Sequence, residues 1–352
     1  MNALTVMCLA SLFLLAACST NRTEQAAAPP PGVGSIERLD PALDALVPAS
    51  ARIEKIGSGY EFTEGPIYMR EGHLLFSDIP PNVIRKWTPD GGTVDFRKPS
   101  GYDGTDAPKG AFIGSNGLTL DKEGRLVICE HGNGRVTRLE KDGKLTVLAA
   151  KFQGKRLNSP NDAVYKSDGS LYFTDPPYGF VDQDKDPKKE LKFNGVYRLN
   201  PDGKLILLTK ELTRPNGIGF SPDEKYLYVA NSDEAHKVWI KYTVRPNGTL
   251  GEGKLFFDAT ANQEDGLPDG LKLDVNGNLY GTGPGGIWIF SPDGKHLGTI
   301  KTPETPANLH WGKYAKTNAE AVMTPDEKAD TLYITARTGL YRVQLAVAGI
   351  RP

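Results

Sequence analysis

Six similar segments follow one another through most of this 352-residue sequence. Each has a polar turn, an apolar strand ending in small or polar residues, a gap and a second strand, as in EGHLLFSDIPPNVIRKWTPDG. The segments are spaced by about 50 residues, a period typical of propeller blades. They begin at Glu71, Glu123, Asp168, Asp223, Asn276 and Lys328. The repeat therefore predicts an all-β fold, a six-bladed β-propeller.

The residues inside the segments favour strands over helices. In residues 171–174 (LYFT) and 332–335 (LYIT), most side chains are β-branched or aromatic, and turn-forming residues precede them. Outside the N-terminus, no run of about 10 to 12 residues has a convincing helical apolar period. A helical solenoid is therefore not expected, and a two-sheet sandwich would not explain six similar units.

The first 18 residues resemble the signal peptide of a bacterial lipoprotein. They are mostly apolar, end in Leu-Ala-Ala-Cys18, and are too short to span a membrane. The resemblance implies that Cys18 becomes the diacylated N-terminus on the periplasmic side of a membrane. Because Ser19 follows instead of Asp, the outer membrane is preferred. A plain cleaved signal with release into the periplasm is the alternative.

Composition divides the rest of the chain into a tether and one domain. Residues 19–45 begin with a stretch rich in Ala, Pro and Gly that has little to bury, and they are expected to form a flexible tether. The propeller is expected to span residues 46–352. Beyond the targeting segment, the only cysteine is Cys129, which lies in a strand pattern and is expected to be buried and structural.

Charge limits the partners that this chain can attract. The formal net charge is -1, and acidic and basic residues are interspersed along the sequence. Such a surface does not attract nucleic acid or an anionic membrane electrostatically. We therefore expect no nucleic-acid contact, and contact with a membrane only through a lipid anchor at Cys18. A monomer that binds a small molecule is expected.

An oxygen-bearing side chain occupies the same slot ahead of each segment. In a propeller the innermost strand of each blade lines the axis, so equivalent slots face one another although about 50 residues separate them. Turn formation alone would explain Asn and Asp in these slots, but it would not explain Glu64. The six slot residues are Glu64, Asn116, Asn161, Asn216, Asp269 and Asn308.

This set of side chains suits a hard metal ion. Carboxylate and amide oxygens from separate blades favour Ca²⁺, and Mg²⁺, Mn²⁺ and Zn²⁺ are the alternatives. The five histidines include no closely spaced pair from which a conventional zinc site could be built.

Several motifs resemble the senescence-marker-protein/gluconolactonase family, in particular its bacterial gluconolactonase-like branch. They occur in order over residues 50–345: FTEGPIY, SNGLTLD, RLNSPNDAVYKSDGSLYFTDPPYG, RPNGIGFSPDEKYLYVANS, LPDGLKLD and TLYITA. The resemblance implies a six-bladed propeller whose central metal is held by Glu64, Asn161, Asn216 and Asp269. It also implies that Asp269 is the catalytic base, and that the reaction is hydrolysis of a sugar-acid lactone or a related ester.

The chemistry of such a site agrees with this interpretation. A divalent cation polarises a lactone carbonyl and activates water, while a carboxylate accepts the proton. Whether Asp269 acts as the base or a metal-bound hydroxide acts as the nucleophile stays open. The residues Asn116, His131, Asn308 and His310 are candidates for substrate binding, and His131 could equally cap a loop.

Two alternatives remain. The segment Asn308-Leu309-His310 also resembles the sixth blade of diisopropyl fluorophosphatase, so the chain could be a related propeller esterase or phosphotriesterase. It could also be a non-catalytic binding propeller that a metal stabilises, because the fold alone does not imply catalysis. No Gly-x-Ser-x-Gly motif supports a serine nucleophile.

Overall fold

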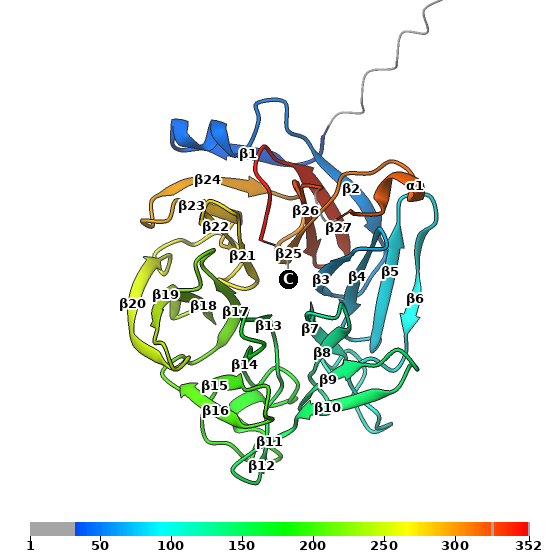
Figure 1. Cartoon of the computed structure of the whole chain (residues 1–352), viewed down its shortest axis with the longest axis vertical. Coiled ribbons are helices and arrows are strands. Elements are labelled where there is room, and N and C mark those ends of the chain that lie inside the picture. The colour runs from blue at the N-terminus through cyan, green and yellow to red at the C-terminus, as the bar shows by residue number, and fades with distance from the viewer. Residues whose placement is uncertain (1–31, 325–326, 351–352) are drawn as a thin grey trace, which may run out of the picture. The chain divides into compact units, whose positions relative to one another are not determined.

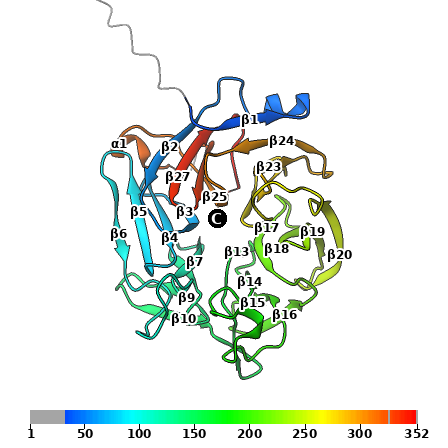
Figure 2. The same cartoon turned by 180° about the vertical axis from the view of Figure 1, so that it is seen from behind.

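The computed structural model describes residues 32–324 and 327–350. The expected signal peptide and lipid anchor therefore lie outside the described residues. The folded unit consists of six antiparallel sheets arranged around a common axis, which Figures 1 and 2 show from its two ends. The predicted six-bladed β-propeller is confirmed.

Each of the first three blades is a four-stranded sheet that runs from the axis outward. Blade one contains β3 (Thr63–Met69), β4 (His73–Asp78), β5 (Val83–Thr88) and β6 (Gly92–Arg97). Blade two contains β7 (Ser115–Leu120), β8 (Leu126–Glu130), β9 (Arg135–Leu139) and β10 (Leu145–Ala149). Blade three contains β13 (Ala163–Tyr165), β14 (Leu171–Asp175), β15 (Gly195–Leu199) and β16 (Leu205–Thr209).

The last three blades follow the same order, with additions from the N-terminal region. Blade four contains β17 (Pro215–Phe220), β18 (Tyr226–Asp233), β19 (His236–Val244) and β20 (Leu250–Asp258). Blade five contains β21 (Leu271–Leu273), β22 (Leu279–Gly283), β23 (Gly286–Phe290), β24 (His296–Lys301) and β1 (Ser35–Arg38). Blade six contains β25 (Pro306–Gly312), β26 (Thr331–Ala336), β27 (Gly339–Gln344) and β2 (Ile53–Ser58).

The two strands recognised in each sequence segment are the middle strands of a blade. Strands such as β14 and β26 are buried along their whole length, because neighbouring blades cover both faces of the sheet. This is why they read as continuous apolar and aromatic runs. Outer strands such as β6 are half exposed and give a weaker pattern.

The ring closes through strands from opposite ends of the chain. Strand β2 is the outermost strand of blade six and pairs antiparallel with β27, with Ile53 opposite Val343. Hydrogen bonds between these strands hold the first and last blades in one closed ring.

The expected tether of residues 19–45 is too long. Strand β1 pairs with β24, and the 3₁₀ helix η1 (Pro41–Ala45) follows, capped by the Asp40 carboxylate, which accepts a hydrogen bond from the Ala42 N–H at 2.8 Å. Leu43 is fully buried in the core that blades five and six share. Burial of a few apolar side chains fixes this segment, although its composition suggested flexibility.

Apolar clusters fill the spaces between neighbouring blades. Cys129 lies in the cluster between blades two and three, and its thiol is free and buried, as predicted. Burial raises the pKa of that thiol well above its usual value.

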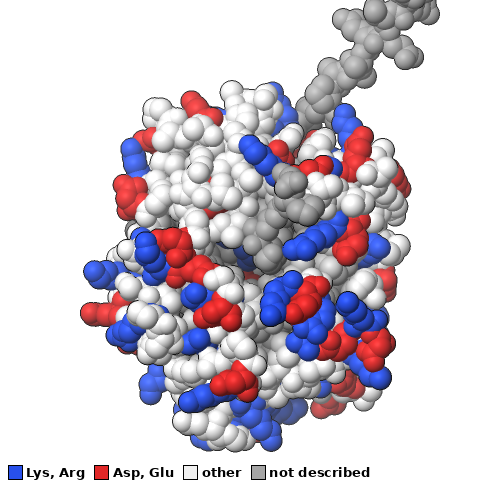
Figure 3. All heavy atoms as spheres, in the orientation of Figure 1, with Lys and Arg blue, Asp and Glu red and all other residues white. Residues whose placement is uncertain are grey.

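The remaining elements are short. They are the hairpin β11 (Lys151–Phe152) and β12 (Lys155–Arg156), the 3₁₀ helix η2 (Gln183–Lys185) and the helix α1 (Asn318–Ala321). Within residues 32–324 and 327–350, no helix is long and apolar enough to cross a membrane. Basic and acidic side chains are interspersed over the face shown in Figure 3.

Candidate active site

The six slot residues lie at the same end of the innermost strands. Glu64, Asn116, Asn216 and Asn308 are in the first three residues of β3, β7, β17 and β25. Asn161 and Asp269 each stand two residues before β13 and β21. Because every innermost strand starts at this end of the axis, the six residues form a ring, which we call the slot ring. Turn formation does not account for the four members that lie inside strands.

Amide hydrogen bonds connect members of the slot ring across blade boundaries. Asn308 Nδ2 donates to Glu64 Oε2 at 2.9 Å, which links blades six and one. Asn116 Nδ2 donates to Asn161 Oδ1 at 2.8 Å, and Asn161 Nδ2 donates to Asn216 Oδ1 at 2.5 Å. Side chains that are far apart in the sequence are thus in direct contact, as the slot pattern predicted.

A glycine after the slot residue lets neighbouring blades approach closely. The Gly117 N–H donates to the Asn161 carbonyl at 2.7 Å, and the Gly217 N–H donates to the Asp269 carbonyl at 3.1 Å. A Cβ at position 217 would lie 2.1 Å from that Asp269 oxygen. Each pair of a slot residue and a following glycine therefore has two functions. The first residue places a polar side chain on the axis, and the glycine, which has no Cβ, allows the backbone of the next blade to approach closely.

The two carboxylates of the slot ring lie in an environment that disfavours their charge. Burial raises the pKa of Glu64 to about 7, and the charge of Asp162 adds to the effect, while the Asn308 amide and the Gly65 N–H oppose it. Burial and the charge of Glu64 raise the pKa of Asp269 well above its usual value. Asp269 Oδ1 is buried and has no hydrogen-bond partner among the described residues.

These features fit a bound cation. Two buried carboxylates that repel each other are costly unless a positive charge compensates them, and the unpartnered Asp269 oxygen is free to act as a ligand. The neighbouring donors are carboxylate and amide oxygens, which are the ligands of Ca²⁺ and Mg²⁺. Among residues 32–324 and 327–350, no three His, Cys, Asp or Glu side chains are grouped to hold a metal. The four predicted metal ligands include only two carboxylates, because the other two ligands are asparagine amides.

His131 joins the slot ring from blade two. It follows β8 directly, it is fully buried, and its Nε2 lies 3.2 Å from Asn161 Oδ1. Burial lowers the pKa of His131 to about 4, although the contact with Asn161 opposes the shift. The imidazole is therefore neutral at neutral pH, and it also contacts the Phe112 backbone.

His310, in contrast, is part of a different site. It lies on β25 beyond Asn308, where Nδ1 is 3.3 Å from the Tyr68 N and 2.7 Å from the Trp311 carbonyl oxygen. Burial lowers its pKa to about 3, with a further contribution from Lys272. The structure thus places Asn116, His131 and Asn308 in the slot ring or against it, while the hydrogen bonds of His310 go to neighbouring backbone.

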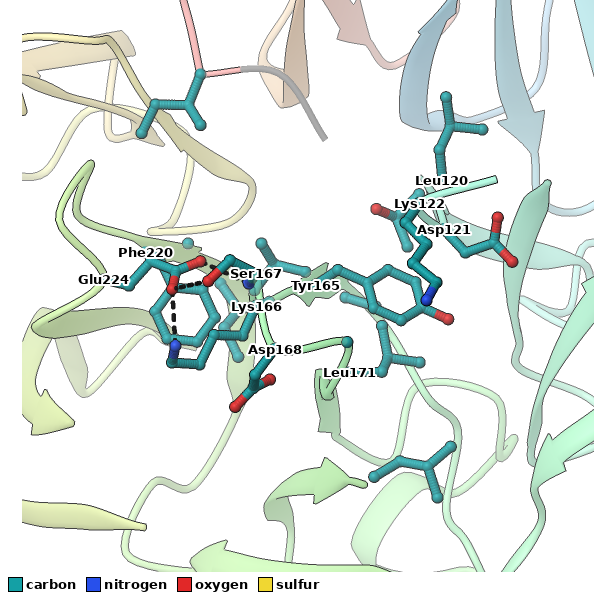
Figure 4. A pocket seen from close by; sticks show the side chains of 18 of the residues that line it. Leu120, Asp121, Lys122, Tyr165, Lys166, Ser167, Asp168, Leu171, Phe220 and Glu224 are labelled. Atoms are coloured by element: carbon teal, nitrogen blue, oxygen red, sulfur yellow. Dashed lines mark hydrogen bonds and ion pairs between the residues drawn. The ribbon is translucent and has the colours of Figure 1, made fainter. Parts of the chain in front are cut away.

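His310 lines a cavity at the other end of the innermost strands, which we call the far cavity. The far cavity has a volume of about 740 Å³, and the residues that line it include Leu120, Tyr165 and Phe220, at the ends of β7, β13 and β17 (Figure 4). Its described lining contains no member of the slot ring. Although it is a large cavity, the carboxylates and amides that suit the predicted chemistry lie at the opposite end.

Sequence reasoning gave no role to three polar residues beside the slot ring. Tyr178 follows β14, its hydroxyl lies 3.5 Å from the Ser232 carbonyl oxygen, and its pKa is raised by burial and by the charge of Asp269. Asp162 and Lys272 form an ion pair at 3.2 Å. Tyr178 belongs to the motif FTDPPYG, so its place in the sequence could have indicated a functional role. No sequence pattern predicts the ion pair between Lys272 and Asp162.

The fold and the slot ring together define a six-bladed propeller with a polar site on its axis. A family model described as "SMP-30/Gluconolactonase/LRE-like region" matches residues 62–338. The chain therefore belongs to the SMP-30/gluconolactonase/LRE-like family, as its motifs predicted.

Three known proteins show how similar the chain is to members of this family and to a related hydrolase. A gluconolactonase of Zymomonas mobilis is 40% identical over 328 residues, which cover 90% of this chain and 88% of that protein. The solved structure of a gluconolactonase from Xanthomonas campestris superposes with a TM-score of 0.73 at 32% identity, covering 90% of this chain and 98% of that one. The diisopropyl-fluorophosphatase of Loligo vulgaris is 25% identical over 272 residues, covering 72% of this chain and 83% of that enzyme.

Proposed function

We propose that this chain opens the ring of a sugar-acid lactone by hydrolysis, with the help of one divalent cation. Its family and its 40% identity to a gluconolactonase make it a lactone hydrolase. The proposed cation ligands are Glu64, Asn161, Asn216 and Asp269. The observation that best supports them is the buried Asp269 Oδ1, which has no hydrogen-bond partner among the described residues and shares the slot ring with a second buried carboxylate.

Calcium is the proposed ion. The slot ring offers neutral amide oxygens and two carboxylates from separate strands, a set that suits the larger and more variable coordination of Ca²⁺. When bound, the cation supplies Lewis-acid polarisation of the lactone carbonyl and of a water molecule. The same charge would keep Glu64 and Asp269 ionised, against the effect of burial.

Asp269 is the proposed base. It would accept a proton from the water that attacks the lactone carbonyl carbon, and the ring C–O bond would then break. The ring oxygen would leave as an alkoxide and take up the proton that Asp269 accepted from the water, so that Asp269 is ionised again and the product is an open sugar acid.

Neutral polar groups around the slot ring would position the sugar. His131 is uncharged at neutral pH because of its burial, and it contacts Asn161 of the slot ring. Asn116 has a buried Oδ1 without a hydrogen-bond partner among the described residues. Such groups bind hydroxyls of a substrate without adding charge to the site. The role first given to His310 is not part of this proposal.

The test is hydrolysis of glucono-1,5-lactone by protein that lacks residues 1–18, followed as acid release. EDTA should remove the activity, and Ca²⁺ should restore it well above the spontaneous rate, with Mg²⁺, Mn²⁺ and Zn²⁺ as comparisons. Folded protein that is inactive with every metal would refute the proposal and favour a non-catalytic binding propeller.

A second candidate activity is hydrolysis of a phosphotriester. The similarity to the Loligo vulgaris diisopropyl-fluorophosphatase is the observation that favours it. Paraoxon, a phosphotriester, would be assayed under the same conditions as the lactone. A kcat/KM for the phosphotriester above that for every lactone tested would make the phosphotriester activity the main one.

The location and the oligomeric state are further proposals. We propose a monomer that is anchored through an acylated Cys18 on the periplasmic side of the outer membrane. Labelling with a fatty acid that is lost in Cys18→Ala would support the anchor, and light scattering would give the mass of the soluble domain. A dimer, or labelling that Cys18→Ala retains, would contradict the respective proposal.

A further inference from the structure

Lys272 reaches from blade five to blade three beside the slot ring. It lies on β21, three residues beyond Asp269, and its Nζ donates to the Leu271 carbonyl at 3.0 Å and to Asp162 Oδ2 at 3.2 Å. Asp162 directly follows the slot residue Asn161 and is 2% exposed, whereas the Lys272 side chain is 21% exposed and lines the far cavity. The amino group is therefore held next to the slot ring, on the side that faces the far cavity.

Three carboxylates and this one amino group influence one another electrostatically. The ion pair between Asp162 and Lys272 places one further carboxylate and one amino group beside Glu64 and Asp269, the two carboxylates of the slot ring. When all three carboxylates are ionised, they carry three negative charges, of which Lys272 compensates one. Two negative charges remain, equal and opposite to the charge of one divalent cation.

Two other buried carboxylates are neutralised by partners within their own blades. Glu130 bonds with Arg135 and Thr137 within blade two, and Asp78 pairs with Arg85 within blade one. Their charges are therefore compensated by partners in their own blades. Asp162 differs because its partner comes from another blade and lies beside the slot ring.

We propose that Lys272 sets the net charge of the slot ring and its surroundings so that the site selects a single divalent cation. This inference rests on the proposed function, because it presumes that the slot ring binds a metal. A low-dielectric site tolerates little net charge, so a match between the site and its ion is favourable and a mismatch is penalised. Lys272 thus acts through its charge, by compensating one carboxylate beside the slot ring, and it need not contact the ion.

The experiment compares the affinities of purified metal-free protein for Tb³⁺ and Ca²⁺, measured by titration calorimetry. Lys272→Gln leaves one more negative charge, so the ratio of Tb³⁺ affinity to Ca²⁺ affinity should rise by about tenfold or more. Lys166→Gln is the matched control. Lys166 also lines the far cavity and pairs with Glu224 at 2.7 Å, as Figure 4 shows, and its loss should leave the ratio unchanged.

Two further variants keep the inference testable if Lys272→Gln does not fold. Asp162→Asn removes a negative charge, so the affinity ratio should fall by about tenfold or more. The double variant Asp162→Asn with Lys272→Gln restores the original net charge, and its ratio should return to within about threefold of the wild type.

The outcomes separate this inference from the proposed function. If wild-type protein binds neither ion, the metal part of the proposed function fails, and this inference fails with it. If wild-type protein binds Ca²⁺ but the ratio is the same in Lys272→Gln and Asp162→Asn, the inference is overturned while the metal site stands. An equal change in Lys166→Gln would also overturn it, because the effect would then belong to surface charge.

Discussion

Gly217→Ala tests whether close contact between blades positions the slot ring. A Cβ at this residue would lie 2.1 Å from the Asp269 carbonyl oxygen and 2.7 Å from the Leu271 N, where ordinary contact begins at 3.4 Å. Blades four and five must therefore separate by about 1 Å. Overpacking of this kind costs about 1 to 3 kcal/mol. The weakened hydrogen bond from the Gly217 N–H adds about 1 kcal/mol. We expect a loss of about 2 to 4 kcal/mol of unfolding free energy.

Gly217→Ala should also lower the activity of the molecules that remain folded, beyond the loss that unfolding alone would cause. A shift of about 1 Å in a catalytic group can reduce the rate by about 100-fold, and Asp269 is the residue that the new methyl group would displace. Urea unfolding and lactone hydrolysis by the folded fraction would measure the two effects. Gly251→Ala is the control, because its Cβ would meet Thr243 at 3.5 Å. Wild-type stability and activity in Gly217→Ala would refute this account of the glycines.

Three other predictions follow from the burial of charged and reactive groups. Asp269→Asn should reduce kcat by about 100-fold or more while circular dichroism stays unchanged, and full activity would remove Asp269 from the mechanism. Without metal, the contribution of Glu64 to the unfolding free energy should fall as the pH rises from 4.5 to about 7, because folding raises the pKa of Glu64 and the folded state retains its proton longer. The lowered pKa values of His131 and His310 act in the opposite direction, so the difference between wild type and Glu64→Gln in thermal melts is the measurement, and a rise of that difference with pH would contradict the shift. Cys129 should react with a thiol reagent only after unfolding, and fast labelling of native protein would show that the thiol is accessible.

The blades and most of the slot ring could be predicted because they repeat. The middle strands are buried on both faces, so each repeat has the same apolar run. The slot residues start equivalent strands, which brings Glu64 and Asn308 together although 244 positions separate them. Outer strands are half exposed and follow no strict pattern. The pairing of β2 with β27 depends on a partner at the other end of the chain, and no local feature of residues 53–58 indicates it.

The surroundings of His310 and the ion pair of Lys272 could not be predicted, because both depend on distances along the propeller axis. His310 lies only two residues beyond Asn308 on the same strand, yet it lines the far cavity. Lys272 follows Asp269 in a short strand where an exposed lysine would be equally natural. That its side chain crosses to blade three is determined by the radius of the ring and by the burial of Asp162, and neither can be derived from local sequence.

The closure of blade six by β2 has a consequence for how the site forms during folding. A nascent or truncated chain that lacks either end can pair strands within single blades, but it cannot hold Glu64 of blade one next to Asn308 of blade six. Contacts between such distant residues form late in folding, because closing the long intervening loop costs conformational entropy before the contacts stabilise the chain. Metal binding would therefore indicate that the ring is complete. Fragments produced by cleavage between blades should not bind the metal, even where the sheets of single blades remain folded.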